Sequence, residues 1–161
     1  MATPANSDDD LLRGHADALA AGIVAAIGPW VESSVARIAD AWRPGLANDL
    51  RAAAADAARR AVADMGPEVR ELLATDVDAQ RTGPLALLRD AVRYPTDVLA
   101  AAGVPSVVRD GFAERAFPAD VYDLAPASFA DLDPDLRDLG LTWGAAKAHV
   151  VLARRRAEGL R

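Results

Sequence analysis

The fold of this chain is decided by residues 31–42, which read VESSVARIADAW. Apolar side chains recur there at Val31, Val35, Ile38 and Trp42, with intervals of four, three and four residues. Because an α-helix has about 3.6 residues per turn, these intervals place all four on one face and predict an amphipathic helix. The segment therefore predicts a helix that packs on a partner through this stripe.

Glycine and proline pairs divide the sequence around this helix. Gly28-Pro29 precedes it, and we expect this pair to break or kink an earlier helix that begins at Ser7, a capping residue followed by three aspartates. Arg43-Pro44-Gly45 ends it. An Ala-rich helix from Leu46 to Met65 then ends at Gly66-Pro67, where a further helix opens.

The second half has a different texture, because it holds most of the aromatic residues and prolines. Pro84 starts a short helix, which Tyr94-Pro95 is expected to stop or bend because the residue before a proline avoids helical geometry. A brief turn ends at Gly140, and Thr142 is expected to cap a last helix from Trp143 to about Glu158.

These signals predict an all-α protein with one domain. We expect residues 1–7 to form a disordered tail and residues 8–161 to form a helical domain. Its first part, 8–80, should be an Ala-rich helical bundle, and its second part, 83–158, short helices with ordered proline-rich loops. No stretch alternates between apolar and polar residues in the way that a half-buried strand requires.

Composition excludes several classes of protein. The 161 residues include 38 alanines and no cysteine, so disulfides, thiolate zinc sites and iron–sulfur clusters are ruled out. The net charge of −6 makes the protein acidic and opposes binding to nucleic acid or an anionic membrane. No export signal is visible, and the uncharged stretch Ala18–Val31 has 14 residues against the ~20 that a spanning helix needs. We expect a cytoplasmic protein that does not enter a membrane.

Catalytic, cofactor and metal motifs are not found in the sequence. The phosphate-binding loops, the dinucleotide fingerprint and the hydrolase nucleophile elbow are all missing, so we expect no cofactor. His15 lies on an apolar stripe and is expected in the core or at its boundary, while His149 has no helical partner for a metal pair. Asp131-x-Asp133-x-Asp135 departs from a calcium loop at its later positions and is expected to be a solvated loop and helix cap. Enzymatic activity is uncertain, and a non-catalytic protein is favoured.

Charge is segregated near the end of the chain. Residues 110–138 carry a net charge of −6, and residues 143–161 carry +4. These blocks can pair with each other, or the basic block can be a docking patch for an acidic protein, a phosphate or RNA. The patch contains an aromatic residue, an aliphatic residue and four cations: Trp143, Lys147, Val150, Arg154, Arg155 and Arg156. Of these, Trp143, Lys147, Val150 and Arg154 share a face at helical spacing.

Aromatic residues give a further candidate site. Tyr94, Phe112 and Tyr122 lie among the proline-rich connections and are expected either to form a satellite core or to line a pocket for a small ligand. Trp42 belongs to the Val31 stripe, whereas Trp30, on another helical face, could be an anchor for a partner.

Three short motifs lie within residues 84–156: Tyr94-Pro95-Thr96, Ala116-Phe117-Pro118 and Trp143-Gly144-Ala145-Ala146-Lys147. This region resembles that of small uncharacterised proteins from high-GC actinobacteria. The resemblance implies a bacterial cytoplasmic setting and no particular activity.

The sequence therefore favours a non-catalytic interaction or regulatory protein that binds another macromolecule through a helical face. A protein partner is expected first, and self-association through the Ala-rich helices is also compatible with the sequence. A phosphate- or RNA-binding module that uses the basic last helix is the alternative. A third hypothesis is a small-ligand binder or enzyme with a pocket among the aromatics.

Overall fold

The computed structural model describes residues 4–106 and 124–159, with side chains described from Ser7 onward. Two long helices, α1 (Pro4–Trp42) and α2 (Leu46–Ala74), form an antiparallel pair joined by a tight turn. The helical run formed by α3 (Pro84–Leu88), the 3-10 turn η1 (Arg89–Val92) and α4 (Arg93–Ala101) packs back along α1 and α2. A second 3-10 turn, η2 (Phe129–Asp131), precedes α6 (Leu136–Ala157), which lies along α1. The all-α prediction is confirmed.

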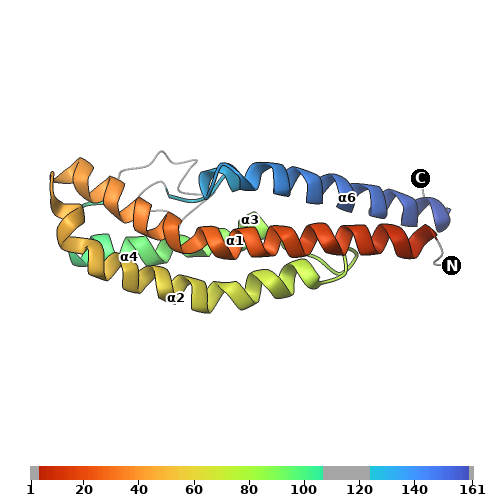
Figure 1. The fold of residues 1–161 in the computed structure, drawn as a ribbon, viewed down its shortest axis with the longest axis horizontal. Helices are drawn as coiled ribbons and strands as arrows, with labels where there is room; N and C mark the ends of the chain where they lie inside the picture. The colour runs from red at the N-terminus through yellow and green to blue at the C-terminus, as the bar shows by residue number, and fades with distance from the viewer. Residues whose placement is uncertain (1–3, 107–123, 160–161) are drawn as a thin grey trace.

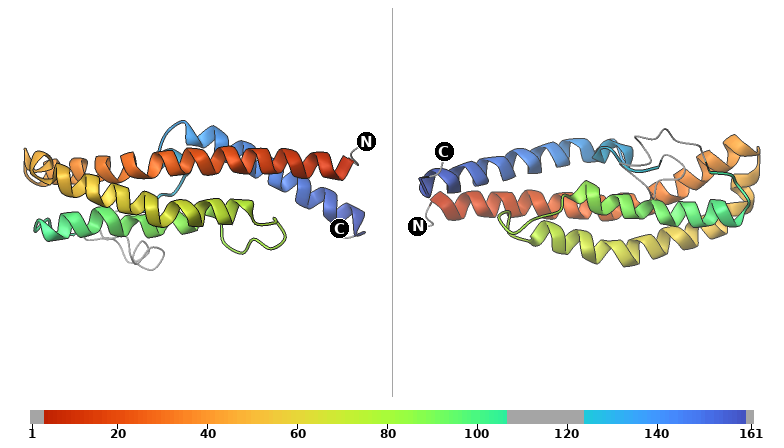
Figure 2. Two further views of the ribbon diagram at one scale, coloured as in Figure 1. Left: turned by 60° about the horizontal axis from the view of Figure 1, so that its bottom comes forward. Right: turned by 180° about the vertical axis from the view of Figure 1, so that it is seen from behind.

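The molecule is an elongated bundle (Figure 1). Helix α6 runs antiparallel to α1, so the first turns of α1 and the last turns of α6 lie at the same end. The opposite end is made by the turn between α1 and α2, and Figure 2 shows the same arrangement from two other directions. Helix α6 contacts mainly α1, and the side of α6 that faces away from α1 is left uncovered by the other described helices.

The predicted helix end at Gly66-Pro67 is wrong, and Gly28-Pro29 does not break its helix. Helix α1 continues through Gly28-Pro29, and α2 continues through Gly66-Pro67. Both prolines point to solvent while both glycines are buried. A Cβ at Gly28 would lie 3.5 Å from the side chain of Val62 on α2, so the bare backbone lets the two helices approach closely. Each proline lacks a backbone N–H and so costs its helix one hydrogen bond. The apolar surface that α1 and α2 bury against each other outweighs this cost.

The α1–α2 contact is built largely from alanine. Ala54, Ala57, Ala58 and Ala61 are all buried, and they face a row of larger α1 side chains that includes Ile23, Ile27 and Val31. Small side chains on one helix let large ones from the other fill the space between the axes. This part of the Ala-rich surface is therefore occupied within the chain rather than exposed for self-association.

Several predicted boundaries move. Helix α1 begins at Pro4, so the Ser7 cap is wrong. Tyr94-Pro95 does not stop a helix but lies in the first turn of α4. A proline in the first turn of a helix has no hydrogen bond to lose. Between Pro84 and Ala101, η1 is the only turn that is not α-helical. Helix α6 begins at Leu136, before the predicted Thr142 cap, and the Thr142 hydroxyl instead donates to the carbonyl of Asp138, 2.8 Å away.

Helix α1 also bears on localisation. By length and composition alone, Ser7–Trp42 could cross a membrane, and 56% of its most apolar window is buried inside the bundle. The core helix of a soluble bundle passes the same test, so the finding is weak evidence for either setting.

Candidate functional site

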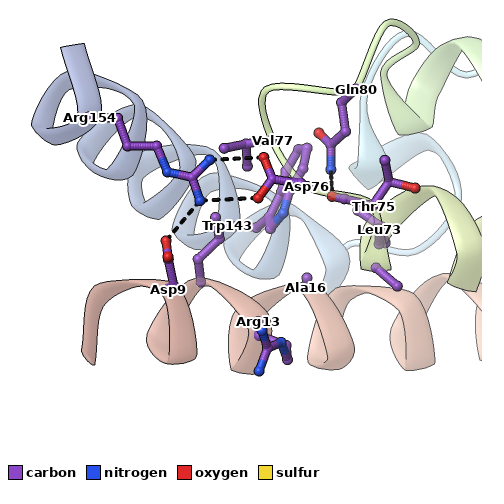
Figure 3. A pocket seen from close by; sticks show the side chains of 12 residues that line it. Asp9, Arg13, Ala16, Leu73, Thr75, Asp76, Val77, Gln80, Trp143 and Arg154 are labelled. Atoms are coloured by element: carbon purple, nitrogen blue, oxygen red, sulfur yellow. Dashed lines mark hydrogen bonds and ion pairs between the residues drawn. The ribbon is translucent and has the colours of Figure 1, made fainter. Parts of the chain in front are cut away.

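A polar cavity of about 220 Å³ lies where four segments meet: the first turns of α1, the end of α2, the loop of residues 75–83 and α6 (Figure 3). Trp143 forms part of its apolar wall. Its polar lining combines three acids or amides with two cations and a hydroxyl, from Asp9, Arg13, Thr75, Asp76, Gln80 and Arg154.

Arg154 is the hub of this cavity. Its two terminal nitrogens donate to the two carboxylate oxygens of Asp76 over 2.8 and 3.1 Å, a bidentate pair. The same guanidinium donates to Asp78 and, over 3.2 Å, to Asp9 on α1. Since the Arg154 side chain is 29% exposed, the ion pairs are only partly screened by water. One side chain thus joins α6, α1 and the loop after α2.

A second polar contact fixes the same loop. Lys147 donates to the side-chain oxygen of Gln80 over 2.7 Å, and its ammonium lies 5.1 Å from the centre of the Trp143 ring. The Gln80 amide in turn donates to the carbonyls of Leu72 and Thr75 over 3.3 and 3.0 Å. These bonds reinforce the end of α2, where the Leu72 carbonyl also accepts from the backbone N–H of Thr75 over 3.3 Å.

The electrostatics of the cavity keep Asp76 and Arg154 in their charged forms. The Arg154 guanidinium lowers the pKa of Asp76 below its usual 3.8, and the backbone N–H of Asp78, which donates to the same carboxylate over 2.9 Å, acts in the same direction. The hydrogen bonds to Asp76 and Asp78 raise the pKa of Arg154. A general base needs a pKa near the working pH, so this pair is suited to holding elements together rather than to proton transfer.

Metal binding finds no support in residues 4–106 and 124–159, where no group of three His, Cys, Asp or Glu side chains is arranged to hold an ion. The guanidinium of Arg154 occupies the space between the nearest carboxylates. In the Asp131-x-Asp133-x-Asp135 stretch, Asp131 accepts from the backbone of Ser128 over 2.7 Å and Asp133 from that of Asp135 over 2.8 Å. Asp131 caps the 3-10 turn η2 and Asp133 bonds within the turn that follows, whereas Asp135, which precedes α6, makes no side-chain cap bond.

The predicted basic patch on the last helix is divided by the structure. Trp143 and Val150 are buried against α1, Arg154 is paired with three aspartates, and Lys147 is bound to Gln80. The shared face that helical spacing predicts is present, but it points inward. Only Arg155 and Arg156 of that group are exposed, so the predicted docking patch is wrong as a single outward surface.

The predicted aromatic site is represented by one residue. Tyr94 is buried, and its hydroxyl donates to Asp64 on α2 over 2.6 Å and accepts from Arg93 over 2.8 Å. Burial, followed by the hydrogen bond to Asp64, raises the pKa of Tyr94. Tyr94 therefore ties α4 to α2, while Phe112 and Tyr122 lie outside the described residues.

The two histidines are at the bundle surface or its boundary. His15 is half-buried, as predicted. His149 is exposed, and its Nε2 lies 3.4 Å from a carboxylate oxygen of Asp8 across the α1–α6 contact.

The roles predicted for Trp30 and Trp42 are reversed. Trp30 is buried in the core, and Trp42 is 50% exposed at the end of α1. Because α1 is continuous, Trp30 joins the buried row that includes Ile23 and Ile27, and the stripe of Val31 and Val35 ends before Trp42 is reached. The two tryptophans lie on different faces, as their separation predicts.

The turn that presents Trp42 is firmly fixed. The carboxylate of Asp40 accepts from the backbone of Ala47 over 2.9 Å, Gly45 adopts a positive φ of 88°, and the side chain of Leu46 is buried. Arg43 lies 3.7 Å from Asp49 across the turn. An exposed indole on such a rigid turn is preorganised for binding, since little freedom is lost when a partner covers it.

No protein-family model, curated protein or solved structure matches this chain.

Sequence reasoning missed Asp9, Gln80 and the outward face of α6. Asp76 and Asp78 are close together in the sequence, but the cation that pairs with them lies 76 to 78 residues further along the chain. Charge balance alone could not have matched them.

Proposed function

We propose that this chain is a non-catalytic cytoplasmic interaction protein that binds another protein through the tip of the bundle, with Trp42 as the anchor. The observation that carries this proposal is the half-exposed indole on a hydrogen-bonded turn. Tryptophan, with tyrosine and arginine, is enriched among the interface positions that dominate binding energy. An exposed Trp that the core does not need is best explained by a surface that is covered some of the time.

The surroundings of Trp42 support this role. The adjacent residues Arg43, Pro44 and Gly45 are exposed, so the tip projects beyond the packed helices. Arg43 and Asp49 offer both signs of charge at the rim, as is usual around an apolar hot spot. Among the described residues that line the polar cavity, in contrast, no nucleophile is paired with a general base. The cavity's strongest hydrogen bonds join lining residues to one another, as between Arg154 and Asp76.

The experiment is affinity capture from an extract of the native cell with wild-type protein, Trp42→Ala and Leu11→Ala. Leu11 is 58% exposed at the other end of α1 and serves as the matched control for loss of a surface apolar side chain. We expect a protein captured by the wild type and by Leu11→Ala, with at least about tenfold less recovered by Trp42→Ala. Circular dichroism should confirm that all three are folded.

Three results would overturn the proposal. The first is an identical set of captured proteins for the wild type and Trp42→Ala, and the second is no capture by the wild type. The third is capture that disappears on nuclease treatment and on replacement of Arg155 and Arg156, which would favour the nucleic-acid alternative.

A further inference from the structure

The outward face of α6 carries a regular stripe, which we call the outer stripe: Asp138, Leu141, Ala145, Ala148, Leu152 and Arg155. All six side chains are exposed, and the two leucines are 66% and 52% exposed. Helix α6 lies along α1 (Figure 1), and Trp143 and Val150, on the face of α6 opposite the outer stripe, are buried. The packing of α6 on α1 does not explain why two leucines lie on the side of α6 that faces solvent.

The intervals along the outer stripe are three, four, three, four and three residues. This is the repeat by which two helices wrap around each other, because it keeps one seam facing the partner. The stripe is also symmetric about the midpoint between Ala146 and Lys147: alanine mirrors alanine, and Leu141 mirrors Leu152. Its two ends, Asp138 and Arg155, have opposite charges.

We propose that α6 pairs in antiparallel orientation with α6 of a second copy of this chain through the outer stripe. A two-fold axis at the midpoint sets Leu141 against the partner copy's leucine at 152, and Ala145 against alanine at 148. The same axis sets Asp138 against arginine at 155, twice, once at each end. Each contact is thus repeated by symmetry.

Charge selects this orientation. A parallel pair would place aspartate against aspartate at one end and arginine against arginine at the other, and like charges that face each other across an interface are unfavourable. The central alanines let the helix axes approach to the short end of the ~8–10 Å range, which brings the leucines into contact. A different protein as occupant would not require the stripe to be its own mirror image.

The contact is small. The outer stripe spans about 27 Å of helix, and one helix pair buries less than the ~800 Å² per partner of a standard interface. We therefore expect a dimer that forms in the micromolar range and separates on dilution. The tip with Trp42 lies at the other end of the bundle, so this dimer does not depend on the proposed function.

Analytical ultracentrifugation across protein concentrations tests the proposal by charge exchange. Asp138→Arg and Arg155→Asp should each weaken dimerisation by at least about tenfold, because each creates two like-charge contacts. The double variant Asp138→Arg/Arg155→Asp should restore it, and Arg156→Asp, which makes the same charge change just off the stripe, should leave it unchanged. Trp42→Ala should also dimerise normally, which separates this test from that of the proposed function.

Disulfide cross-linking tests the orientation, since the chain contains no cysteine. A mixture of Leu141→Cys and Leu152→Cys chains should form a mixed disulfide dimer on mild oxidation, while neither variant alone should cross-link efficiently. A strictly monomeric wild type at high concentration would overturn the proposal. So would cross-linking of each single variant with itself, or equal dimerisation by all the charge variants.

Discussion

Arg154 on α6 and Asp76 beyond the end of α2 share two hydrogen bonds, over 2.8 and 3.1 Å, although 78 residues separate them in the sequence. Asp9 on α1 contacts the same guanidinium. Arg154 thus links three segments at the end of the bundle where α1 begins and α6 ends. The other side-chain hydrogen bond described between α6 and the 75–83 loop runs from Lys147 to Gln80. The relationship makes Arg154 the most informative position for a stability test.

Arg154→Ala should lower the free energy of unfolding by about 1 kcal/mol, since three partly exposed ion pairs are lost together and such pairs contribute less than buried ones. Urea denaturation followed by circular dichroism measures the change. Arg156→Ala is the control, because Arg156 sits two residues on in the same basic last turn and its side chain is exposed. Equal effects of the two substitutions would show that helix-end charge, not the contact with Asp76, is responsible.

The pH dependence follows from the lowered pKa of Asp76. A carboxylate whose pKa falls on folding stabilises the folded state above its unfolded-state pKa, and this contribution disappears as the pH drops through the folded-state value. The difference in unfolding free energy between the wild type and Asp76→Asn should therefore be constant from about pH 5 to 7 and shrink below 3.8. A difference that is insensitive to acid would contradict this account.

Gly140 and Gly144 lie one turn apart on α6 and should respond in opposite ways to alanine. A Cβ at Gly140 would collide with the ring of Phe129, whose Cε2 would be 2.6 Å away, whereas a Cβ at Gly144 meets nothing within 4 Å. Gly140→Ala should destabilise the protein by about 1–3 kcal/mol, and Gly144→Ala should stabilise it by up to about 1 kcal/mol. Thermal or urea unfolding measures both.

The control for this pair is Phe129→Ala in the Gly140→Ala background. Removal of the ring should recover part of the stability lost on Gly140→Ala. If the double variant were as unstable as the sum of the two single variants, the collision would not be the cause.

Trp30 and Trp42 should differ sharply in their contribution to folding. Trp30→Ala should cost about 3–5 kcal/mol, because it empties a large volume in the core, whereas Trp42→Ala should cost less than about 1 kcal/mol. Urea unfolding curves for both variants provide the comparison. A large loss on Trp42→Ala would place that side chain in the core and remove the basis of the proposed binding tip.

The helical class could be predicted from the sequence because apolar spacing repeats over long stretches. The breaks at Gly28-Pro29 and Gly66-Pro67 could not be judged locally. Whether such a pair ends a helix depends on whether the proline faces solvent and the glycine faces a neighbour, which is a property of the assembled bundle. Once α1 is continuous, the exchange of roles between Trp30 and Trp42 follows from helical geometry.

The candidate site was less predictable than the fold. Helical spacing correctly placed Trp143, Lys147 and Arg154 on one face, but it does not tell which face of a helix meets its neighbour. That direction is set by contacts between residues far apart in sequence, such as Arg154 with Asp76. The outer stripe is visible in the sequence once α6 is known to begin at Leu136 rather than at Trp143.

The distribution of the three tryptophans has a practical consequence. Trp30 is buried in the α1 core, Trp143 is buried where α6 meets α1, and Trp42 is half in water. Indole emission shifts to shorter wavelengths when water is removed from the ring, so docking at the tip, release of α6 and loss of the core should each leave a distinct optical signature. The native chain therefore already contains the chromophores needed to follow these three events separately, without any attached dye.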